Sequence, residues 1–180
     1  DRIYPLYTEY RQMAEQVVDE STPDTFRLQE SSYIYDVNRD VIAKLTMDED
    51  SYYLPYDEIP EYAIQAFVAV EDRTFWENSG IDLKGIVRVV IGYITSKGEE
   101  VHGTSTITQQ LARNVYLTHE LSIERKGKEI FLALALSEKY SKEIMEFYVN
   151  NICYANGIYG IAGAAKAYFD KNVDELTLSE

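Results

Sequence analysis

Apolar positions recur at helical spacing along most of the chain, and this periodicity is its main structural signal. Residues 1–30 are polar, rich in tyrosine and compatible with a helix that Pro23 breaks. Apolar and polar residues alternate in "SSYIYDVNRDVIAKL" (31–45), where "VNRD" supplies a turn, so this segment predicts a short β-hairpin. The rest predicts a mainly α domain with helices at residues 60–75, 82–97, 105–116, 122–139, 141–151 and 158–169.

The length of 180 residues suits one domain with a substantial core. We expect residues 1–30 to form an N-terminal helical or linker segment and residues 31–180 to form the main domain. Its last residues, "LTLSE", stop inside a helical pattern, so we expect the domain to be truncated there. The longest apolar run, "IFLALAL" (130–136), falls short of the roughly 18 to 20 residues that a membrane span needs. Any membrane anchor is therefore expected outside these residues.

Charge restricts the possible ligands. The chain has 17 Lys and Arg against 31 Asp and Glu, a net charge of −14, which repels nucleic acid and anionic lipid. An anionic ligand therefore requires a local cluster of bases. The single Cys153 excludes an internal disulfide, and no group of Cys and His residues has the spacing of a metal site. We predict no metal site and no nucleic-acid partner.

The adjacent acids Glu71 and Asp72 in "EDRTFWENSG" (71–80) follow a strongly apolar run. If the helix continues through them, Ile64, Val68, Glu71 and Phe75 share one stripe, where desolvation would raise the pKa of Glu71 and make it a general acid or base. In the alternative interpretation the helix ends near residue 70, and both acids flank or cap the next turn. This stretch alone favours the alternative.

The segment "HGTSTITQQLARN" (102–114) enters a helix through a loop, with Thr104 or Ser105 as the expected N-cap. Polar side chains then follow the helix axis, where the free N–H groups of its first turn favour anions. A solvated helix face is an equally acceptable interpretation. The polar residues at helical spacing are Ser105, Gln109 and Arg113 on one line and Gln110 and Asn114 on another.

In "ERKGKEIFLALALSEKY" (124–140), Arg125 and Lys126 precede Glu129 by four and three residues, so the three side chains can meet on one helix face. The simpler interpretation is an exposed ion pair worth about 0.3 to 0.5 kcal/mol. The functional one is a carboxylate held among bases that also bind an anionic leaving group. Taken alone, this segment favours the exposed pair.

Five segments in order resemble the glycosyltransferase family 51, the peptidoglycan glycosyltransferases of class A penicillin-binding proteins. "GTSTITQQLARN" is almost identical to the family pattern GxSTITQQxxKN, which is highly specific. The other four are "EDRTFWENSG" (EDxxFxxHxG), "RKGKE" (RKxxE), "SKEIMEFYVN" (KxxILExYLN) and "GIYGIAGAAKAYFDK" (GxxGxxxAxxxYFGK).

The resemblance implies a lysozyme-like, two-lobed helical fold that rests on the extracytoplasmic face of the bacterial cell membrane. It implies polymerisation of lipid II, in which a growing polyprenyl-linked glycan is the donor, and inhibition by moenomycin. No cofactor is firmly required, although a divalent cation, Mg²⁺ or Mn²⁺, near the pyrophosphate is compatible with the family. The upstream segment "SYIYDVNRDVIAKL" (32–45) resembles the corresponding segment of class A proteins and favours a parent protein with a transpeptidase domain.

By motif position, Glu71 is the general base on the acceptor GlcNAc 4-hydroxyl, and Glu129 is the second catalytic carboxylate near the pyrophosphate. The desolvated stripe would activate Glu71, and the cations would stabilise the departing pyrophosphate. The residues predicted to bind substrate are Asp72, Phe75, Ser105, Thr106, Gln109, Gln110, Arg113, Asn114, Arg125 and Lys126.

Four positions depart from the family patterns. Asn78 stands in place of the usual His, which predicts altered anchoring of its loop rather than loss of activity. Arg113 replaces Lys and keeps the charge. One residue is missing near Lys142, and Asp170 replaces a Gly at a helix end. Two rival functions remain: a lysozyme-like glycan hydrolase, which also needs a carboxylic acid, and a catalytically impaired scaffold protein.

Overall fold

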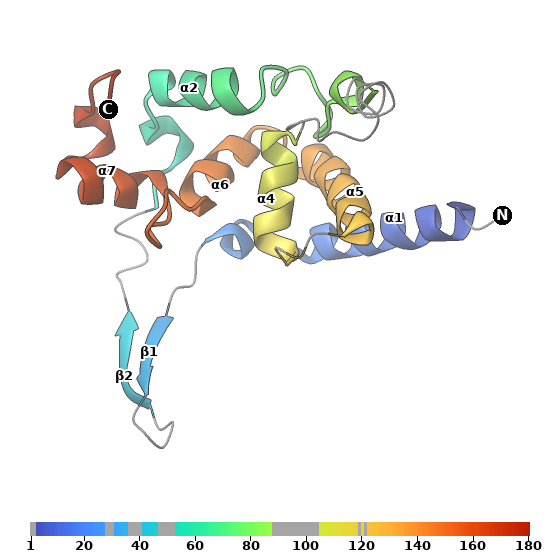
Figure 1. Ribbon diagram of the computed structural model, residues 1–180, viewed down its shortest axis with the longest axis horizontal. Coiled ribbons are helices and arrows are strands. Elements are labelled where there is room, and N and C mark those ends of the chain that lie inside the picture. Colours follow the sequence, from blue (N-terminus) through green and yellow to red (C-terminus); the bar gives the residue numbers. More distant parts are fainter. Residues whose placement is uncertain are drawn as a thin grey trace, which may run out of the picture.

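The computed structural model describes residues 3–27, 31–35, 41–46, 53–87, 105–118, 120 and 122–180. These residues are mainly helical, which confirms the prediction of a mainly α domain (Figure 1). The helices are α1 (Ile3–Glu20), α2 (Glu61–Glu71), α4 (Ile107–Tyr116), α5 (Ile123–Tyr140), α6 (Glu143–Asn151) and α7 (Ile161–Phe169). Short 3₁₀ turns lie at Pro23–Phe26, Tyr56–Glu58 and Val173–Glu175.

The core forms where α4, α5 and α6 meet. Helix α4 packs against both α5 and α6, and the apolar side of each helix supplies fully buried side chains such as Leu111, Leu132 and Met145. Side chains spaced three or four residues apart lie on one helix face, so the periodic pattern of the sequence becomes this shared interior. Core packing therefore fixes the positions of α4 and α5, and with them the first turns of both helices.

Residues 3–27 pack against this core. Helix α1 lies along α5, and the ring of Tyr7 meets Phe131 edge-on at 5.2 Å. The ammonium group of Lys139 donates to the carbonyl oxygens of Val18, Asp19 and Ser21 at 2.8, 3.0 and 2.7 Å. A cation at a helix C-terminus satisfies carbonyls that have no partner within the helix. Helix α1 is thus an integral part of the helical body.

Two strands, β1 (Ser31–Tyr35) and β2 (Val41–Thr46), form an antiparallel pair with Ser31 opposite Thr46 and Tyr35 opposite Val41. Figure 1 shows the pair extending away from the helices. The strands lie in the segment for which alternation predicts a hairpin. The predicted turn "VNRD" lies outside the described residues, so the hairpin connection stays a prediction.

Five predicted helices correspond to observed helices, with ends that differ by up to four residues. The largest difference is at the end of α2, which stops at Glu71 rather than residue 75. Most of the predicted helix at 82–97 and the predicted loop at 95–104 lie outside the described residues. Helix α7 ends at Asp170, whose φ of 54° is left-handed, the conformation that the Gly of the family pattern adopts readily.

Phe26 tests whether the N-terminal segment belongs to the folding unit. Its side chain is fully buried and stacks on Phe147 with the ring centroids 4.2 Å apart. We expect Phe26→Ala to lower the free energy of unfolding by about 3 to 5 kcal/mol. Denaturant unfolding measures this, and Leu6→Ala on the exposed side of α1 is the control. A loss below about 1 kcal/mol would mean that the segment is only appended to the domain.

Candidate active site around the first turns of α4 and α5

Glu71 is the last residue of α2, and its side chain is exposed. Asp72 follows with φ −155°, outside the helical region, so the helix does not continue to Phe75. The alternative interpretation of the sequence is therefore the correct one. The predicted apolar stripe does not bury Glu71, and desolvation is not what would make this carboxylate reactive.

Asp72 is the buried acid of the pair, with 6% of its surface exposed. Its Oδ1 accepts from the backbone N–H and the hydroxyl of Thr74 at 3.2 and 3.1 Å. The amide nitrogen of Asn78 donates to both carboxylate oxygens, at 3.1 and 3.0 Å, and the N–H of Ile107 donates to Oδ2 at 3.3 Å. These hydrogen bonds satisfy a charge that burial would otherwise make costly.

Asp72 also explains how the start of α4 is held. The N–H of Ile107 is the first of the helix, and unpaired N–H groups at this end attract anions. Here the anion is a side chain of the protein itself. The sequence predicted that this helix terminus binds an external anion. For the N–H of Ile107 that prediction is wrong, because this group donates to Asp72.

The loop after Asp72 is anchored at both of its ends. Phe75 is buried, packs into the core and borders a cavity with Trp76 and Asn78, and its predicted role in binding substrate stays a prediction. At the far end, Thr106 donates its hydroxyl to the carbonyl of Gly80 at 2.6 Å. Gly80 has φ 90°, and a Cβ there would lie 2.3 Å from the carbonyl oxygen of Ala133. Only glycine allows this close approach to α5.

Thr106 is the N-cap of α4, whereas the sequence predicted Thr104 or Ser105. Its hydroxyl accepts from the N–H of Gln109 at 3.1 Å, and Oε1 of Gln109 accepts from the N–H of Thr106 at 3.1 Å. This is a capping box with Gln in the reciprocal position. Both side chains are buried, so the structure gives them a role in forming the helix; their predicted contact with substrate stays untested.

Gln110 connects Glu71 to the core. Its Nε2 donates to Oε2 of Glu71 at 2.8 Å, and its Oε1 accepts from the hydroxyl of Tyr148 at 3.1 Å. Tyr148 was not among the predicted site residues. It belongs to "SKEIMEFYVN", so the motif indicated its importance, but the sequence did not show that its hydroxyl faces α4. Burial raises the pKa of Tyr148, Glu71 adds to that effect, and Arg113 opposes it.

Glu129 is fully buried and accepts from Nη1 of Arg125 at 2.5 Å and from the ammonium group of Lys126. The expectation of an exposed ion pair is therefore wrong, because only the Lys126 side chain, 41% exposed, reaches solvent to a large extent. Lys126 also donates to the hydroxyl of Ser105 at 2.8 Å, just before α4. Both ion pairs lie within α5, and the hydrogen bond from Lys126 to Ser105 links this helix to the residues just before α4.

Arg113 and Asn114, on the second turn of α4 and beyond, are partly buried. Among the described residues, Nε of Arg113 and Nε of Arg125 are buried without a hydrogen-bond partner. Buried donors are normally paired, so these two are available to an acceptor. Two contacts meet near the start of α4. Gln110 in this helix binds Glu71, and Ser105, just before the helix, binds Lys126 of the basic cluster.

The donor set does not form a metal centre. Both carboxylate oxygens of Glu129 are engaged by cations. Within the part of the chain that the structure describes, no group of three or more His, Cys, Asp or Glu side chains is placed to hold a metal ion. The described residues of the site thus provide no cage for the divalent cation that the resemblance allows, and that cation stays a prediction.

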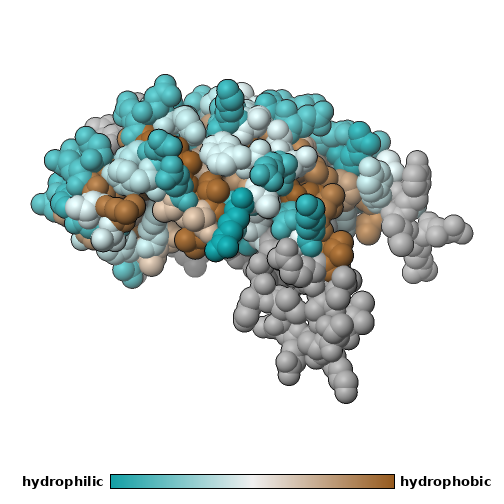
Figure 2. Space-filling view, turned by 90° about the horizontal axis from the view of Figure 1, so that it is seen from above, coloured by the Kyte–Doolittle hydropathy of each residue, from teal (hydrophilic) through white to brown (hydrophobic). Residues whose placement is uncertain are grey.

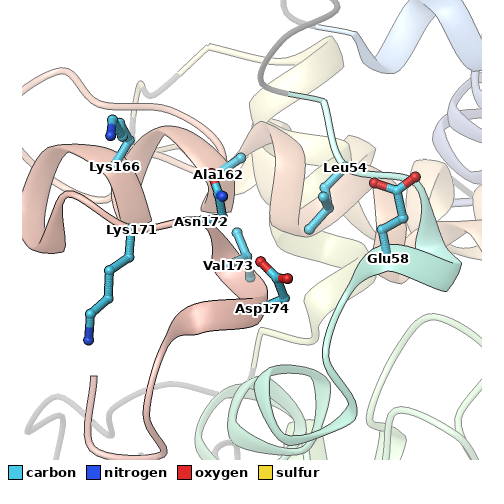
Figure 3. A pocket seen from close by; sticks show the side chains of 8 residues that line it. All are labelled: Leu54, Glu58, Ala162, Lys166, Lys171, Asn172, Val173 and Asp174. Carbon is cyan, nitrogen blue, oxygen red and sulfur yellow. The ribbon is translucent and has the colours of Figure 1, made fainter.

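Two cavities lie away from Glu71. One, of about 610 Å³, is lined by residues of α7, the 3₁₀ turns beside it and Leu54; Figure 3 shows Lys166 and Lys171 with Asp174 and Glu58 around it. The other, of about 550 Å³, lies behind the anchored loop and is bordered by Trp76, Asn78 and Lys142. Neither cavity is lined by the predicted catalytic acids Glu71 and Glu129.

Comparison with known proteins identifies the family of this chain. The family described as "Transglycosylase" matches residues 38–180. Penicillin-binding protein 1F of Bacillus subtilis is 44% identical over 154 residues, 85% of this chain and 21% of that protein. Penicillin-binding protein 1A of Escherichia coli is 40% identical over 176 residues, 97% of this chain and 20% of its own length. Penicillin-binding protein 1A of Aquifex aeolicus is 44% identical over 152 residues, which are 84% of this chain and 21% of that protein.

The chain belongs to the transglycosylase family. It spans about a fifth of the length of the curated relatives that it matches. The residues around α4 and α5 thus form the candidate active site of a transglycosylase domain.

Asn78 is the side chain whose loss should loosen this site without removing a charge. We expect Asn78→Ala to lower the free energy of unfolding by about 1 to 3 kcal/mol, because the buried Asp72 carboxylate loses its amide donor. Asn78→His restores an N–H donor and should recover part of the loss. Thermal unfolding measures both, with exposed Asn156→Ala as the control. Equal stability of Asn78→Ala and the unmodified chain would contradict the anchoring role.

Proposed function

We propose that this chain is a peptidoglycan glycosyltransferase that polymerises lipid II into glycan strands. The observation that carries the proposal is the pairing of two unlike groups at one end of α4. An exposed carboxylate, Glu71, is held by Gln110, and a basic cluster around Glu129 contacts Ser105. Glycosyl transfer from a pyrophosphate donor requires both a base for the attacking hydroxyl and positive charge for the leaving group.

In the proposed reaction, Glu71 acts as the base. The 4-hydroxyl oxygen of the acceptor GlcNAc attacks the anomeric carbon of the donor, and the hydroxyl proton passes to the Glu71 carboxylate. The bond from the anomeric carbon to the phosphate oxygen breaks, and its electron pair leaves with the polyprenyl pyrophosphate. Exposure at the end of α2 supports this role, since the carboxylate is accessible to a sugar hydroxyl.

The pyrophosphate would be bound by the cations of α4 and α5. Arg113 and Arg125 each keep a buried Nε without a partner among the described residues, and Lys126 is partly exposed. Guanidinium groups bind phosphate oxygens with defined geometry. Glu129 then acts chiefly by fixing Arg125 and Lys126, rather than by touching the sugar. Ser105 and Asn114 complete this proposed donor side.

The family resemblance extends the proposal to the whole fold and its location. We propose a lysozyme-like, two-lobed domain from residue 31 onward, placed on the extracytoplasmic face of the bacterial membrane and inhibited by moenomycin.

None of the described helices is both long and apolar enough to cross a membrane. Exposed Val70, Leu83 and Val87 support contact with a membrane surface. Figure 2, which looks onto the side where α2 lies, shows hydrophobic residues scattered among hydrophilic ones.

A hydrolase acting on existing glycan and a catalytically impaired scaffold are the alternatives. The basic cluster favours the transferase, because a hydrolase has no pyrophosphate to stabilise. Incubation with lipid II, followed by separation of products by length, distinguishes the three. Polymer supports the proposal, cleavage of mature glycan without polymer supports the hydrolase, and neither product supports the scaffold.

Glu71→Gln tests the base directly. We expect polymerisation to fall at least about 100-fold, the contribution typical of a general base, while the free energy of unfolding stays within about 0.5 kcal/mol because the side chain is exposed. Glycan length analysis and thermal unfolding give the two readouts. Glu138→Gln, an exposed acid on α5, is the matched control. Unchanged turnover in Glu71→Gln would remove Glu71 from its role.

Arg113→Ala tests the positive charge. We expect it to weaken moenomycin or donor binding by about 1 to 3 kcal/mol, the range for a hydrogen bond to a charged group. Arg113→Lys should keep part of the affinity, since it retains the charge but not the planar fork. Calorimetry provides the dissociation constants, and Arg11→Ala on the exposed face of α1 controls for the change in net charge. An affinity equal to that of the unmodified chain would contradict a phosphate site at Arg113.

A further inference from the structure

Three side chains from three helices form one chain of hydrogen bonds. The hydroxyl of Tyr148 in α6 donates to Oε1 of Gln110 in α4 at 3.1 Å. Nε2 of Gln110 then donates to Oε2 of Glu71 at the end of α2, at 2.8 Å. Tyr148 is 2% exposed whereas Glu71 is exposed, so the chain leads from the protein interior to the accessible carboxylate.

The direction of these hydrogen bonds is fixed by chemistry. An ionised carboxylate only accepts hydrogen bonds, so Gln110 must present its NH₂ group to Glu71. The amide oxygen then faces Tyr148, whose hydroxyl must donate. Without the phenol proton, the amide oxygen of Gln110 would lose its donor, and the carboxylate of Glu71 alone would orient the amide.

We infer that Tyr148 is a positioning residue for the proposed glycosyl transfer. It holds the Gln110 amide so that the amide donates to Oε2 of Glu71, and Oε1 stays open to take the proton of the attacking sugar hydroxyl. No described residue donates a hydrogen bond to Oε1 of Glu71. The inference rests on the proposed function.

Packing and protonation make Tyr148 suited to this task. Its ring meets Phe67 edge-on at a centroid distance of 5.7 Å, which fixes the position of the hydroxyl. Burial, with a smaller contribution from Glu71, raises the pKa of Tyr148, so the phenol keeps its proton at neutral pH. The donor to Gln110 is therefore present at neutral pH.

Tyr148→Phe removes the hydroxyl and keeps the ring. We expect kcat for lipid II polymerisation to fall about tenfold with KM unchanged, as for the loss of a hydrogen bond that contributes about 1.4 kcal/mol in the transition state. The acid side of the pH profile should also move to higher pH, because the ionised form of the base loses support. A kcat within twofold of the unmodified chain would overturn the inference.

Tyr154→Phe is the matched control. Tyr154 also packs edge-on against Phe67, at 6.3 Å, and its hydroxyl faces the carbonyl of Val149 at 3.3 Å instead of Gln110. We expect its kcat and pH profile to match those of the unmodified chain. An equal effect in both variants would assign the loss at Tyr148 to packing around Phe67 and contradict the positioning role.

A double-mutant cycle tests whether Tyr148 acts through Gln110. Gln110→Met removes the amide, so adding Tyr148→Phe to it should produce no further loss. A further tenfold loss in the double variant would show that Tyr148 acts by another route, and the inference would fail.

A spectroscopic measurement separates this inference from the proposed function. In the unmodified chain, the side-chain NH₂ signals of ¹⁵N-labelled Gln110 should shift as Glu71 titrates, and Glu71→Gln should abolish the shift. Tyr148→Phe should reduce it by at least half. Absence of polymer from lipid II with these NMR results intact would overturn the proposed function alone. An undiminished shift in Tyr148→Phe would overturn the positioning role alone.

Discussion

Asp72 follows the end of α2, and its carboxylate is buried between the next loop and the first turn of α4. Thr74, Asn78 and the N–H of Ile107 donate hydrogen bonds to it. Three segments meet at this one group. A buried charge without enough hydrogen bonds would be unstable, so each donor is held where the carboxylate requires it. The end of α2, and with it Glu71, is thereby placed beside α4.

The position of the helix end gives two adjacent acids opposite environments. Because α2 stops at Glu71, that side chain stays at the surface and takes its single described partner from Gln110, whereas Asp72 enters the interior. Neighbouring residues in an extended turn point in different directions, unlike residues on one helix stripe. Consecutive residues thus supply two different carboxylates. The buried Asp72 holds the site together, and the exposed Glu71 is accessible to the sugar hydroxyl of the proposed reaction.

Periodicity predicted the helices well because each has an apolar face that packs into the common core, as Leu111 and Leu132 do. Periodicity extended α2 to residue 75, although the adjacent acids favoured an end near residue 70. The hydrogen bond from Ile107 to Asp72, 35 residues apart in the chain, could not be predicted from local spacing. Local spacing could not separate Gln109 from Gln110 either. Both are polar residues of one helix turn, yet Gln109 closes a capping box while Gln110 reaches Glu71. Such differences depend on tertiary contacts that local spacing does not contain.

The burial of Glu129 looks costly in a chain that already carries a charge of −14. Its effect is to hold Arg125 and Lys126, two long and flexible side chains, in a single arrangement beside Ser105. Arg125 and Lys126 thus pair with one carboxylate, and the charge of this cluster remains positive. Cations that are already ordered lose little entropy when an anion arrives, so they stabilise developing negative charge more effectively than mobile ones. In the proposed function, the buried carboxylate of Glu129 therefore orders the bases that would bind the diphosphate of the donor.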